Sequence, residues 1–353
     1  MLKRLNKKEY IICFGNGPNQ KKIIRSLEKY CPNSIILDRK KKIKFKKKYI
    51  FLKTSIYDYN FTKLKKSLKK YKVFDIAYRS SGPSILLYHK ISKFYKLNKI
   101  SYNLAKCVYS KTFLSNYLDK KKIKNIKSNS INFFSELKKF KGLKVFKPDA
   151  PLIGKKNIFF AKPSDINNSI FEKIKKSSHN KKISLSSFKD GKDITAIYFK
   201  NKKNHKIKLI SLVQEFNYFK NNTLYHFGVC SPQLFKFTNS QQNYINNLPL
   251  KLNPLFKEYY GFFSISLKFD KNFFFIYEIN VGLSGDRYAE IIFPKTYFIK
   301  NIFEIDVKNL INDIKNSDFK SSQKFIGILN KKIFLNKKNI ISYISKLFNG
   351  KKI

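Results

Sequence analysis

Two long apolar segments separated by a short polar tripeptide constrain the fold of this chain more than any other feature. The segments FFSISLKF (262–269) and FFFIYEINV (273–281) are rich in aromatic and β-branched residues, and DKN (270–272) lies between them. Such residues favour strands, and a short polar connection between them predicts an antiparallel hairpin. Glu278 and Asn280 are two residues apart in the second segment, so we expect their side chains on one face of the sheet.

A carboxylate inside an apolar strand is unusual in this chain, which has 75 Lys and Arg against 22 Asp and Glu among its 353 residues. Carboxylate and amide oxygens are ligands that Mg²⁺ prefers, with water and nucleotide phosphates completing its octahedron. The alternative is a structural Glu–Asn pair near the end of a strand. The motif alone does not distinguish the two.

The formal net charge of +53 suits a nucleic-acid-binding protein, but its distribution does not. The lysines run through the whole chain without one dominant block, and only five of the basic residues are arginines. Codon usage in a strongly AT-biased genome would produce this pattern, so we interpret the charge as solvated surface. Nonspecific contact with nucleic acid is still expected at low salt, and a basic RNA-binding protein remains an alternative.

Two of the five arginines stand beside glycine turns, Arg79 in RSSGP and Arg287 in SGDR. A planar guanidinium holds a carboxylate or a phosphoryl group through two parallel hydrogen bonds, which an ammonium cannot do. We therefore take both as candidate binding residues. The alternative for each is a surface position without function.

Features typical of secreted and membrane proteins are missing from the sequence. No apolar run reaches the roughly 18 residues that a membrane span needs, and the N-terminal segment lacks the long apolar core of a signal peptide. The four cysteines form no C-x-x-C pair, which argues against a disulfide framework or a zinc site. We expect a soluble, cytoplasmic protein with no membrane partner.

The N-terminal third has the pattern of an α/β domain. YIICFGNG (10–17) reads as a buried strand ending in a glycine turn, and a helix and a second strand, SIILD, follow. This order predicts a β-α-β unit of an open parallel sheet, although G-N-G-P lacks the third glycine of a dinucleotide fingerprint. VFDIAYRSSGP repeats the strand-to-loop pattern, a helix is predicted over 84–96, and a short strand is predicted over 99–103. Ligands of such sheets bind beyond the carboxyl ends of the strands.

Two further segments combine strands with loops. In VFKPDAPLIGKKN (145–157), Lys147 closes an apolar strand, and the loop with Gly154 could fold over a triphosphate through backbone N–H groups and lysine charge. The Walker pattern G-x-x-x-x-G-K-[ST] is absent, and considered alone Lys147 is one lysine among many. In SLSSFKDGKDITAIYF (184–199), a turn separates two strands and the second begins at Asp193.

The order and spacing of these segments, with a helix that opens at Lys111 after Ser110 as N-cap, resemble the ATP-grasp superfamily over most of the chain. GDRYAE after the hairpin is most similar to the glycinamide ribonucleotide synthetase and biotin carboxylase branches. The resemblance implies an α/β protein, α+β in its C-terminal part. Its expected parts are a Rossmann-like pre-ATP-grasp domain (1–105), a small lid subdomain (106–185) and a large subdomain with a C-terminal extension (186–353).

The same resemblance implies an ATP-dependent ligase that uses Mg²⁺, activates a small-molecule carboxylate as an acyl phosphate and joins it to an amine or another nucleophile. It does not indicate which substrates are used or the oligomeric state. The implied roles are contact with ATP phosphates for Lys111 and Lys147, the lid loop for Gly154, Lys155 and Lys156, the ribose hydroxyls for Asp193, Mg²⁺ for Glu278 and Asn280, catalysis for Arg287 and the substrate carboxylate for Arg79.

The sequence departs from the family pattern at three places. Ser186 and Ser187 stand where paired acids are expected, and the strand 264–269 lacks the common metal-binding acid, with Asp270 the nearest. The glycine loop reads GKKN (154–157) where GGKG is frequent. A catalytically inactive relic of the family is therefore a second alternative.

Overall fold

The structure is a computed structural model of the chain. It describes residues 9–15, 33–39, 49–57, 61–78, 82–97, 99–152, 156–202, 204–220, 222–231, 233, 235–270, 273–282, 323–327 and 332–335.

The N-terminal part contains a four-stranded parallel sheet with the strand order β3-β2-β1-β4. Its strands are β1 (Glu9–Phe14), β2 (Ser34–Asp38), β3 (Ile50–Lys53) and β4 (Lys72–Ala77). Ile12 and Ile35 are register partners and fully buried, as in parallel strands that are apolar along their whole length. The predicted parallel pairing of β1 with β2 is confirmed, and the helix predicted between them lies outside the described residues.

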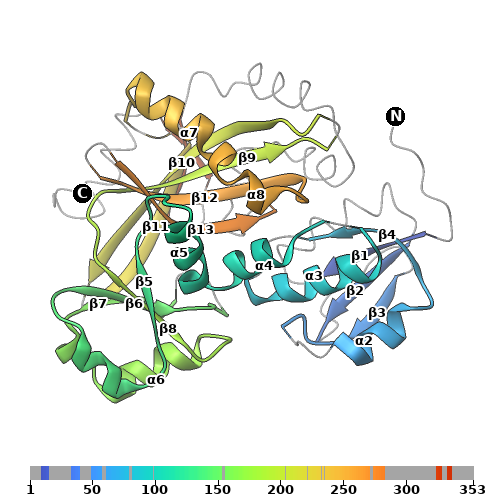
Figure 1. Cartoon of the computed structure of the whole chain (residues 1–353), viewed down its shortest axis with the longest axis horizontal. Coiled ribbons are helices and arrows are strands. Elements are labelled where there is room, and N and C mark those ends of the chain that lie inside the picture. Colours follow the sequence, from blue (N-terminus) through green and yellow to red (C-terminus); the bar gives the residue numbers. More distant parts are fainter. Residues whose placement is uncertain are drawn as a thin grey trace.

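Helix α2 (Phe61–Leu68) lies between β3 and β4 of this sheet. The elements that connect the sheet to the rest of the chain are a 3₁₀ turn (Gly82–Ser84), α3 (Ile85–Phe94), α4 (Tyr102–Tyr109) and α5 (Lys111–Lys120). Figure 1 shows α3, α4 and α5 as a bridge from the N-terminal sheet to the other strands.

Serine caps begin two of these helices. The hydroxyl oxygens of Ser101 and Ser110 accept the backbone N–H groups of Leu104 and Phe113 at 3.2 and 3.1 Å. The cap predicted at Ser110 is confirmed. The short strand predicted over 99–103 is wrong, because the Ser101 cap starts α4 inside that segment.

A small antiparallel sheet follows α5, with the order β7-β6-β8-β5. Its elements are β5 (Ser128–Ile131), a 3₁₀ helix (Phe134–Lys139), β6 (Lys144–Pro148), β7 (Phe159–Ala161), a 3₁₀ turn (Pro163–Asp165), α6 (Asn168–Lys176) and β8 (Ile183–Ser187). α6 buries Phe171 and Ile174 against Phe146 and Ile183 of the strands, so this part has an apolar cluster of its own. We call these four strands the lid sheet.

The large sheet has the order β13-β12-β9-β10-β11, and β11 joins it to β7 of the lid sheet through the pair Thr223 and Phe159. Its strands are β9 (Lys192–Lys200), β10 (Ile207–Lys220), β11 (Thr223–Ser231), β12 (Gly261–Asp270) and β13 (Phe273–Val281), and β14 (Gln323–Gly327) pairs with both β11 and β15 (Lys332–Leu335). Helices α7 (Asn239–Lys251) and α8 (Asn253–Phe256) pack in one cluster with Tyr198 and Phe263. The opposite face of β9 and β12 carries Thr195 and Ser266.

The predicted hairpin is β12 and β13. Ser264 pairs with Asn280 and Ser266 pairs with Glu278, after which the register shifts by one residue so that Leu267 pairs with Ile276. The extra residue of this bulge is Tyr277.

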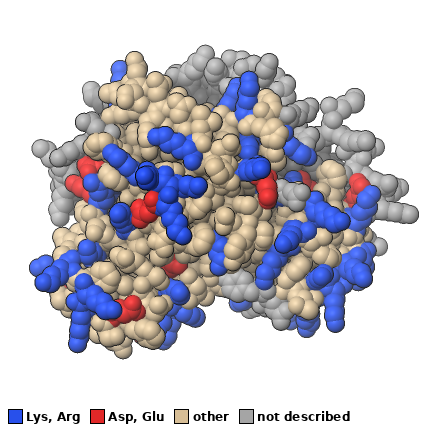
Figure 2. All heavy atoms as spheres, in the orientation of Figure 1, with Lys and Arg blue, Asp and Glu red and all other residues tan. Residues whose placement is uncertain are grey.

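Lysines are dispersed over the face of the molecule in Figure 2, with a few acidic residues among them and no single basic block. The described residues on this face therefore show no localised basic patch. No helix within the described segments has both the length and the apolar character needed to cross a membrane.

Candidate active site

A cavity of about 450 Å³ lies where the lid sheet, the large sheet and α5 meet. Its polar lining comes from strand ends and from the face of the large sheet opposite α7 and α8. The charged residues of the lining are Lys111, Lys147, Lys156, Lys189, Lys268, Asp190, Asp193, Glu215 and Glu278.

Every predicted site residue that the structure describes lies in this lining. The six residues are Lys111, Lys147, Lys156, Asp193, Glu278 and Asn280. They come from α5, β6, the loop before β7, β9 and β13, elements that are far apart in the sequence. The other four predicted residues, Arg79, Gly154, Lys155 and Arg287, lie outside the described residues.

The backbone of β13 presents Glu278 and Asn280 to the cavity together. Both line it, while Ile279 between them is fully buried on the other side. The predicted shared face of these two side chains is confirmed. Because of the bulge, Tyr277 lies on the cavity side as well.

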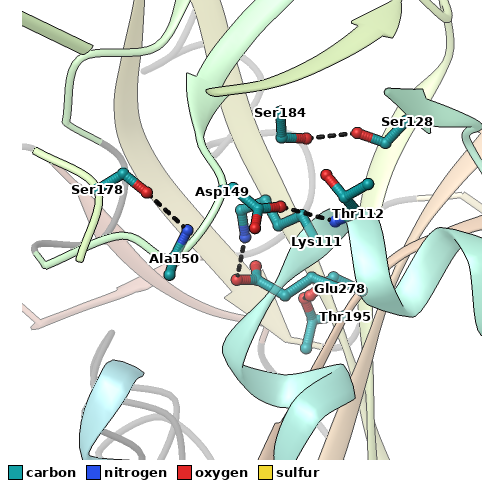
Figure 3. Close-up of polar contacts among 10 residues, drawn as sticks. Lys111, Thr112, Ser128, Asp149, Ala150, Ser178, Ser184, Thr195 and Glu278 are labelled. Atoms are coloured by element: carbon teal, nitrogen blue, oxygen red, sulfur yellow. Dashed lines mark hydrogen bonds and ion pairs between the residues drawn. The ribbon is translucent and has the colours of Figure 1, made fainter. Parts of the chain in front are cut away.

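Lys111 and Glu278 form an ion pair across the cavity. The Lys111 Nζ atom donates to Glu278 Oε1 at 2.8 Å, and the two side chains are 14% and 33% exposed (Figure 3). Burial alone would raise the pKa of the Glu278 carboxyl, but the charge and hydrogen bond of Lys111, with Lys147 nearby, outweigh it and hold that pKa below its ordinary value. Glu278 is therefore an anion available to a cation at neutral pH.

Lys147 has the most perturbed ammonium among the described cavity residues. Burial, and then repulsion from Lys111, lower its pKa to about 8, although the carboxylates Glu278, Asp149 and Asp193 oppose this shift. Its Nζ atom lies 5.8 Å from the centre of the Tyr277 ring. A partly desolvated ammonium interacts more strongly with an anionic ligand than an ammonium in water does.

Asp193 is held at the start of β9 by two donors. Lys268 Nζ lies 2.9 Å from Oδ1 of this carboxylate, and Asn217 Nδ2 donates to Oδ2 at 2.9 Å. Each carboxylate oxygen has more than one acceptor site, so the group can still accept a hydroxyl from a ligand in the cavity.

The described residues around Glu278 are poor in metal-binding acids. Asp270 does not line the cavity, and it pairs with Lys189 at 2.8 Å. Ser266, in the strand that lacks an acid, shares a hydrogen bond of 2.9 Å with Thr195, which donates to Glu215 at 2.8 Å. Within the described segments no group of three His, Cys, Asp or Glu is arranged to hold a metal ion. Glu278 and Asn280 fit a Mg²⁺ ion only if phosphate and water oxygens complete its octahedron.

Ser186 and Ser187 occupy the part of the lining where the family pattern has acids. Both line the cavity at the end of β8, and Lys144 Nζ donates to the Ser187 hydroxyl at 3.1 Å. At these two positions the cavity therefore has hydroxyls in place of carboxylates.

Five charged or amide residues of the lining were missed from the sequence, namely Lys189, Asp190, Glu215, Asn217 and Lys268. The segment LVQEFNYF contains a signal for two of them, because Glu215 and Asn217 repeat the E-x-N spacing of β13. Lys268 has no such signal among so many lysines.

At one end the cavity is bounded by contacts between the N-terminal part and the lid sheet. Tyr57 and Gly82 line it there, and a Cβ atom on Gly82 would lie 2.9 Å from the Pro151 carbonyl oxygen. His179 lies between Tyr109, whose hydroxyl is 3.1 Å from Nδ1, and the Tyr57 carbonyl oxygen, 2.8 Å from Nε2.

Comparisons with known proteins identify the fold but no near relative. No family model and no curated protein sequence matches the chain. N5-carboxyaminoimidazole synthetase from Staphylococcus aureus, complexed with ADP, superimposes with a TM-score of 0.61 at 14% identity, over 86% of this chain and 79% of that one. An L-amino acid ligase from Bacillus licheniformis gives 0.63 at 9% identity, over 91% and 80%.

Phosphoribosylglycinamide synthetase from Anaerococcus prevotii is a third neighbour, with a TM-score of 0.59 at 12% identity over 90% of this chain and 80% of that one. All three neighbours are ATP-grasp enzymes. At these identities the likeness concerns the fold. This chain has the ATP-grasp fold.

Proposed function

We propose that this protein is a Mg²⁺-dependent ligase that uses ATP to activate a small carboxylate as an acyl phosphate and then joins it to an amine or another nucleophile. The observation that carries the proposal is the meeting in one cavity of six residues predicted from separate segments of the sequence. The neighbours support the same class of reaction, because their names are those of synthetases and an amino acid ligase.

The cavity lining suits a nucleotide. Lys111 and Lys147 would bind the ATP phosphates, where a desolvated ammonium is worth more than one in water. Lys156, with Gly154 and Lys155 of the same loop, would cover the phosphates from the lid sheet. Asp193 would accept the ribose hydroxyls.

Glu278 and Asn280 would hold Mg²⁺ from one face of β13, together with oxygens of the nucleotide. When bound there, Mg²⁺ neutralises charge on the transferred phosphoryl group. Lys111 would then exchange its partner, leaving Glu278 for a phosphate oxygen.

The reaction proceeds in two steps. An oxygen of the substrate carboxylate attacks the γ-phosphorus, the bond to the β–γ bridging oxygen breaks, and ADP leaves. The amine nitrogen attacks the acyl carbon and loses a proton, and phosphate leaves with the electrons of the C–O bond. Lys111 and Lys147 stabilise charge on the phosphoryl group, Arg287 holds the acyl phosphate or its parent carboxylate, and Arg79 binds the incoming carboxylate.

The division into parts follows the sequence prediction. Residues 1–105, with their parallel sheet, would be a Rossmann-like pre-ATP-grasp domain, 106–185 the lid and 186–353 the large subdomain. α5 falls within the second range, although its Leu114 and Leu118 pack in one cluster with Ile276 of β13. The cytoplasmic location stays a prediction from the sequence, as does nonspecific contact with nucleic acid at low salt.

Thermal unfolding with Mg·ATP at high salt tests the nucleotide site. We expect stabilisation of the wild type and much less of Lys147→Ala, since a ligand of the folded state raises its stability. Nonspecific charge attraction fades with salt, so the loss of stabilisation at high salt would favour the basic RNA-binding alternative.

A screen of amino acids and small carboxylates for ATP-dependent phosphate release tests the chemistry. We expect release with at least one carboxylate and amine pair. Stabilisation by Mg·ATP without release for any pair would indicate the inactive relic.

A further inference from the structure

Asp149 is a buried carboxylate that the proposed reaction does not use. It follows β6, two residues after Lys147, and is 1% exposed. Its Oδ2 atom accepts the Ser110 hydroxyl at 2.6 Å and the Asn180 amide at 2.6 Å. Its Oδ1 atom accepts the backbone N–H of Thr112 at 2.8 Å, as Figure 3 shows. Three donors to a buried carboxylate make a specific and rigid arrangement.

Backbone hydrogen bonds strengthen the same junction. The Lys111 N–H group donates to the Asp149 carbonyl oxygen at 3.1 Å, and the Asp149 N–H group donates to the Lys182 carbonyl oxygen at 3.1 Å. Residue 149 thus joins three segments: the start of α5, the end of β6 and the turn before β8. α5 packs on the large sheet and the other two belong to the lid sheet, so the junction lies between the two walls of the cavity.

The two lysines proposed to bind phosphate stand on either side of this junction. Lys111 is the first residue of α5, and Lys147 is in β6. Both line the cavity, where their two ammonium groups repel each other. A fixed backbone at both residues limits how far this repulsion can move the two side chains apart. The Asp149 carboxylate fixes both backbones and also meets the positive end of the α5 dipole.

We propose that Asp149 is a positioning residue that holds Lys111 and Lys147 on one polyphosphate subsite. This rests on the proposed function and adds a residue that touches neither phosphate nor metal. A plain helix cap would stabilise α5 without linking it to phosphate affinity, and the test must separate these two roles.

Asp149→Asn keeps the shape and removes the charge that the three donors share. The measurements are isothermal titrations with ATP, ADP and adenosine at high salt, in the wild type and in the double variant Lys111→Met, Lys147→Met. In the wild-type background we expect Asp149→Asn to weaken ATP affinity about tenfold, because misplaced lysines form weaker charged hydrogen bonds with the phosphates. Adenosine has no phosphates, so its affinity should fall less than twofold. In the double variant the same substitution should change ATP affinity less than twofold.

Asp75→Asn is the matched control. Asp75 is also a buried acid, 6% exposed and paired with Lys99 at 2.9 Å, but it does not line the cavity. It should lower the unfolding temperature and leave ATP affinity unchanged. If Asp149→Asn does not fold, Asn180→Ala removes one donor only and should show the same pattern with a smaller loss.

An equal loss of ATP affinity in both backgrounds, or an equal loss for adenosine, would overturn the positioning role and leave a helix cap. If the proposed function itself is wrong, the double variant Lys111→Met, Lys147→Met should bind ATP as well as the wild type does. That outcome overturns both proposals.

Discussion

Replacing Glu278 by glutamine separates the metal-binding role from a packing role. The substitution keeps the size of the side chain and removes one negative charge from a cavity in which Lys111 pairs with that charge at 2.8 Å. Without metal the Glu278 carboxylate repels a triphosphate and competes with it for Lys111. We therefore expect Glu278→Gln to bind metal-free ATP more tightly than the wild type does, and to gain much less from Mg²⁺.

The size of the effect follows from the repulsion between the Glu278 carboxylate and one charge of a triphosphate bound nearby. Unit charges at roughly 6 Å interact by about 3 kcal/mol at an effective dielectric constant near 20. Because Glu278 is 33% exposed, solvent screening reduces this repulsion; about 1–2 kcal/mol remains, or about a 5- to 30-fold gain in metal-free ATP affinity.

Isothermal titration with ATP, in EDTA and then in Mg²⁺, measures both quantities. The control is Glu172→Gln, which removes an acid from α6 that pairs with Lys175 at 3.7 Å and does not line the cavity. It should behave as the wild type. If Mg²⁺ improves ATP affinity by the same factor in Glu278→Gln as in the wild type, the assignment of Glu278 to the metal is wrong.

Four further predictions concern single residues. Lys147 has a pKa of about 8 against 10.5 ordinarily, so its ammonium is lost as pH rises through about 8; ATP affinity should fall over that interval, and this fall should be absent in titrations of Lys147→Met. At neutral pH and high salt, Lys147→Ala should weaken ATP binding far more than Lys42→Ala from the lysine-rich run 40–48, and equal effects would support a nonspecific basic surface. Arg287→Lys keeps the charge and loses the planar fork, so product formation should fall at least tenfold with Mg·ATP binding intact, whereas Arg79→Lys should mainly weaken carboxylate saturation; wild-type turnover of Arg287→Lys would exclude Arg287 from the site. Gly191→Ala would place a Cβ 2.3 Å from the Phe269 carbonyl oxygen at a φ of +122°, so chemical denaturation should show a loss of about 2 kcal/mol or more, and unchanged stability would contradict the close contact of this turn with β12.

Local patterns were sufficient to predict the parts of the site that lie within one strand or one turn. The alternation of FFFIYEINV placed Glu278 and Asn280 on one face because a strand has a period of two, and the structure confirms it. The cap at Ser110 needed only the residue types around it. The order of these motifs along the chain then led to the ATP-grasp fold, which the neighbours confirm.

Contacts set by the order of strands could not be predicted in this way. Glu215 reaches Thr195, and Thr195 reaches Ser266, only because β9 lies between β10 and β12. The ion pair of Lys111 with Glu278 joins residues 167 positions apart, and no local pattern carries such a pairing. Asp270, the acid nearest in sequence to the strand that lacks one, pairs with Lys189 and does not line the cavity, so nearness in sequence does not replace the missing acid.

The cavity lining has a more even balance of basic and acidic residues than the whole chain does. The whole sequence carries +53, yet the cavity lining combines five lysines with four acidic residues, and two of the acids pair with lysines across strands and helices. Ammonium groups removed from water need such partners, whereas those on the surface are solvated. On the proposed function, a triphosphate would replace Glu278 as the partner of Lys111, and a Mg²⁺ ion held by Glu278 would compensate that carboxylate for the lost ammonium. On this argument the binding of Mg·ATP depends on a few matched pairs, so it should survive salt concentrations that abolish contact between the lysine-rich surface and nucleic acid.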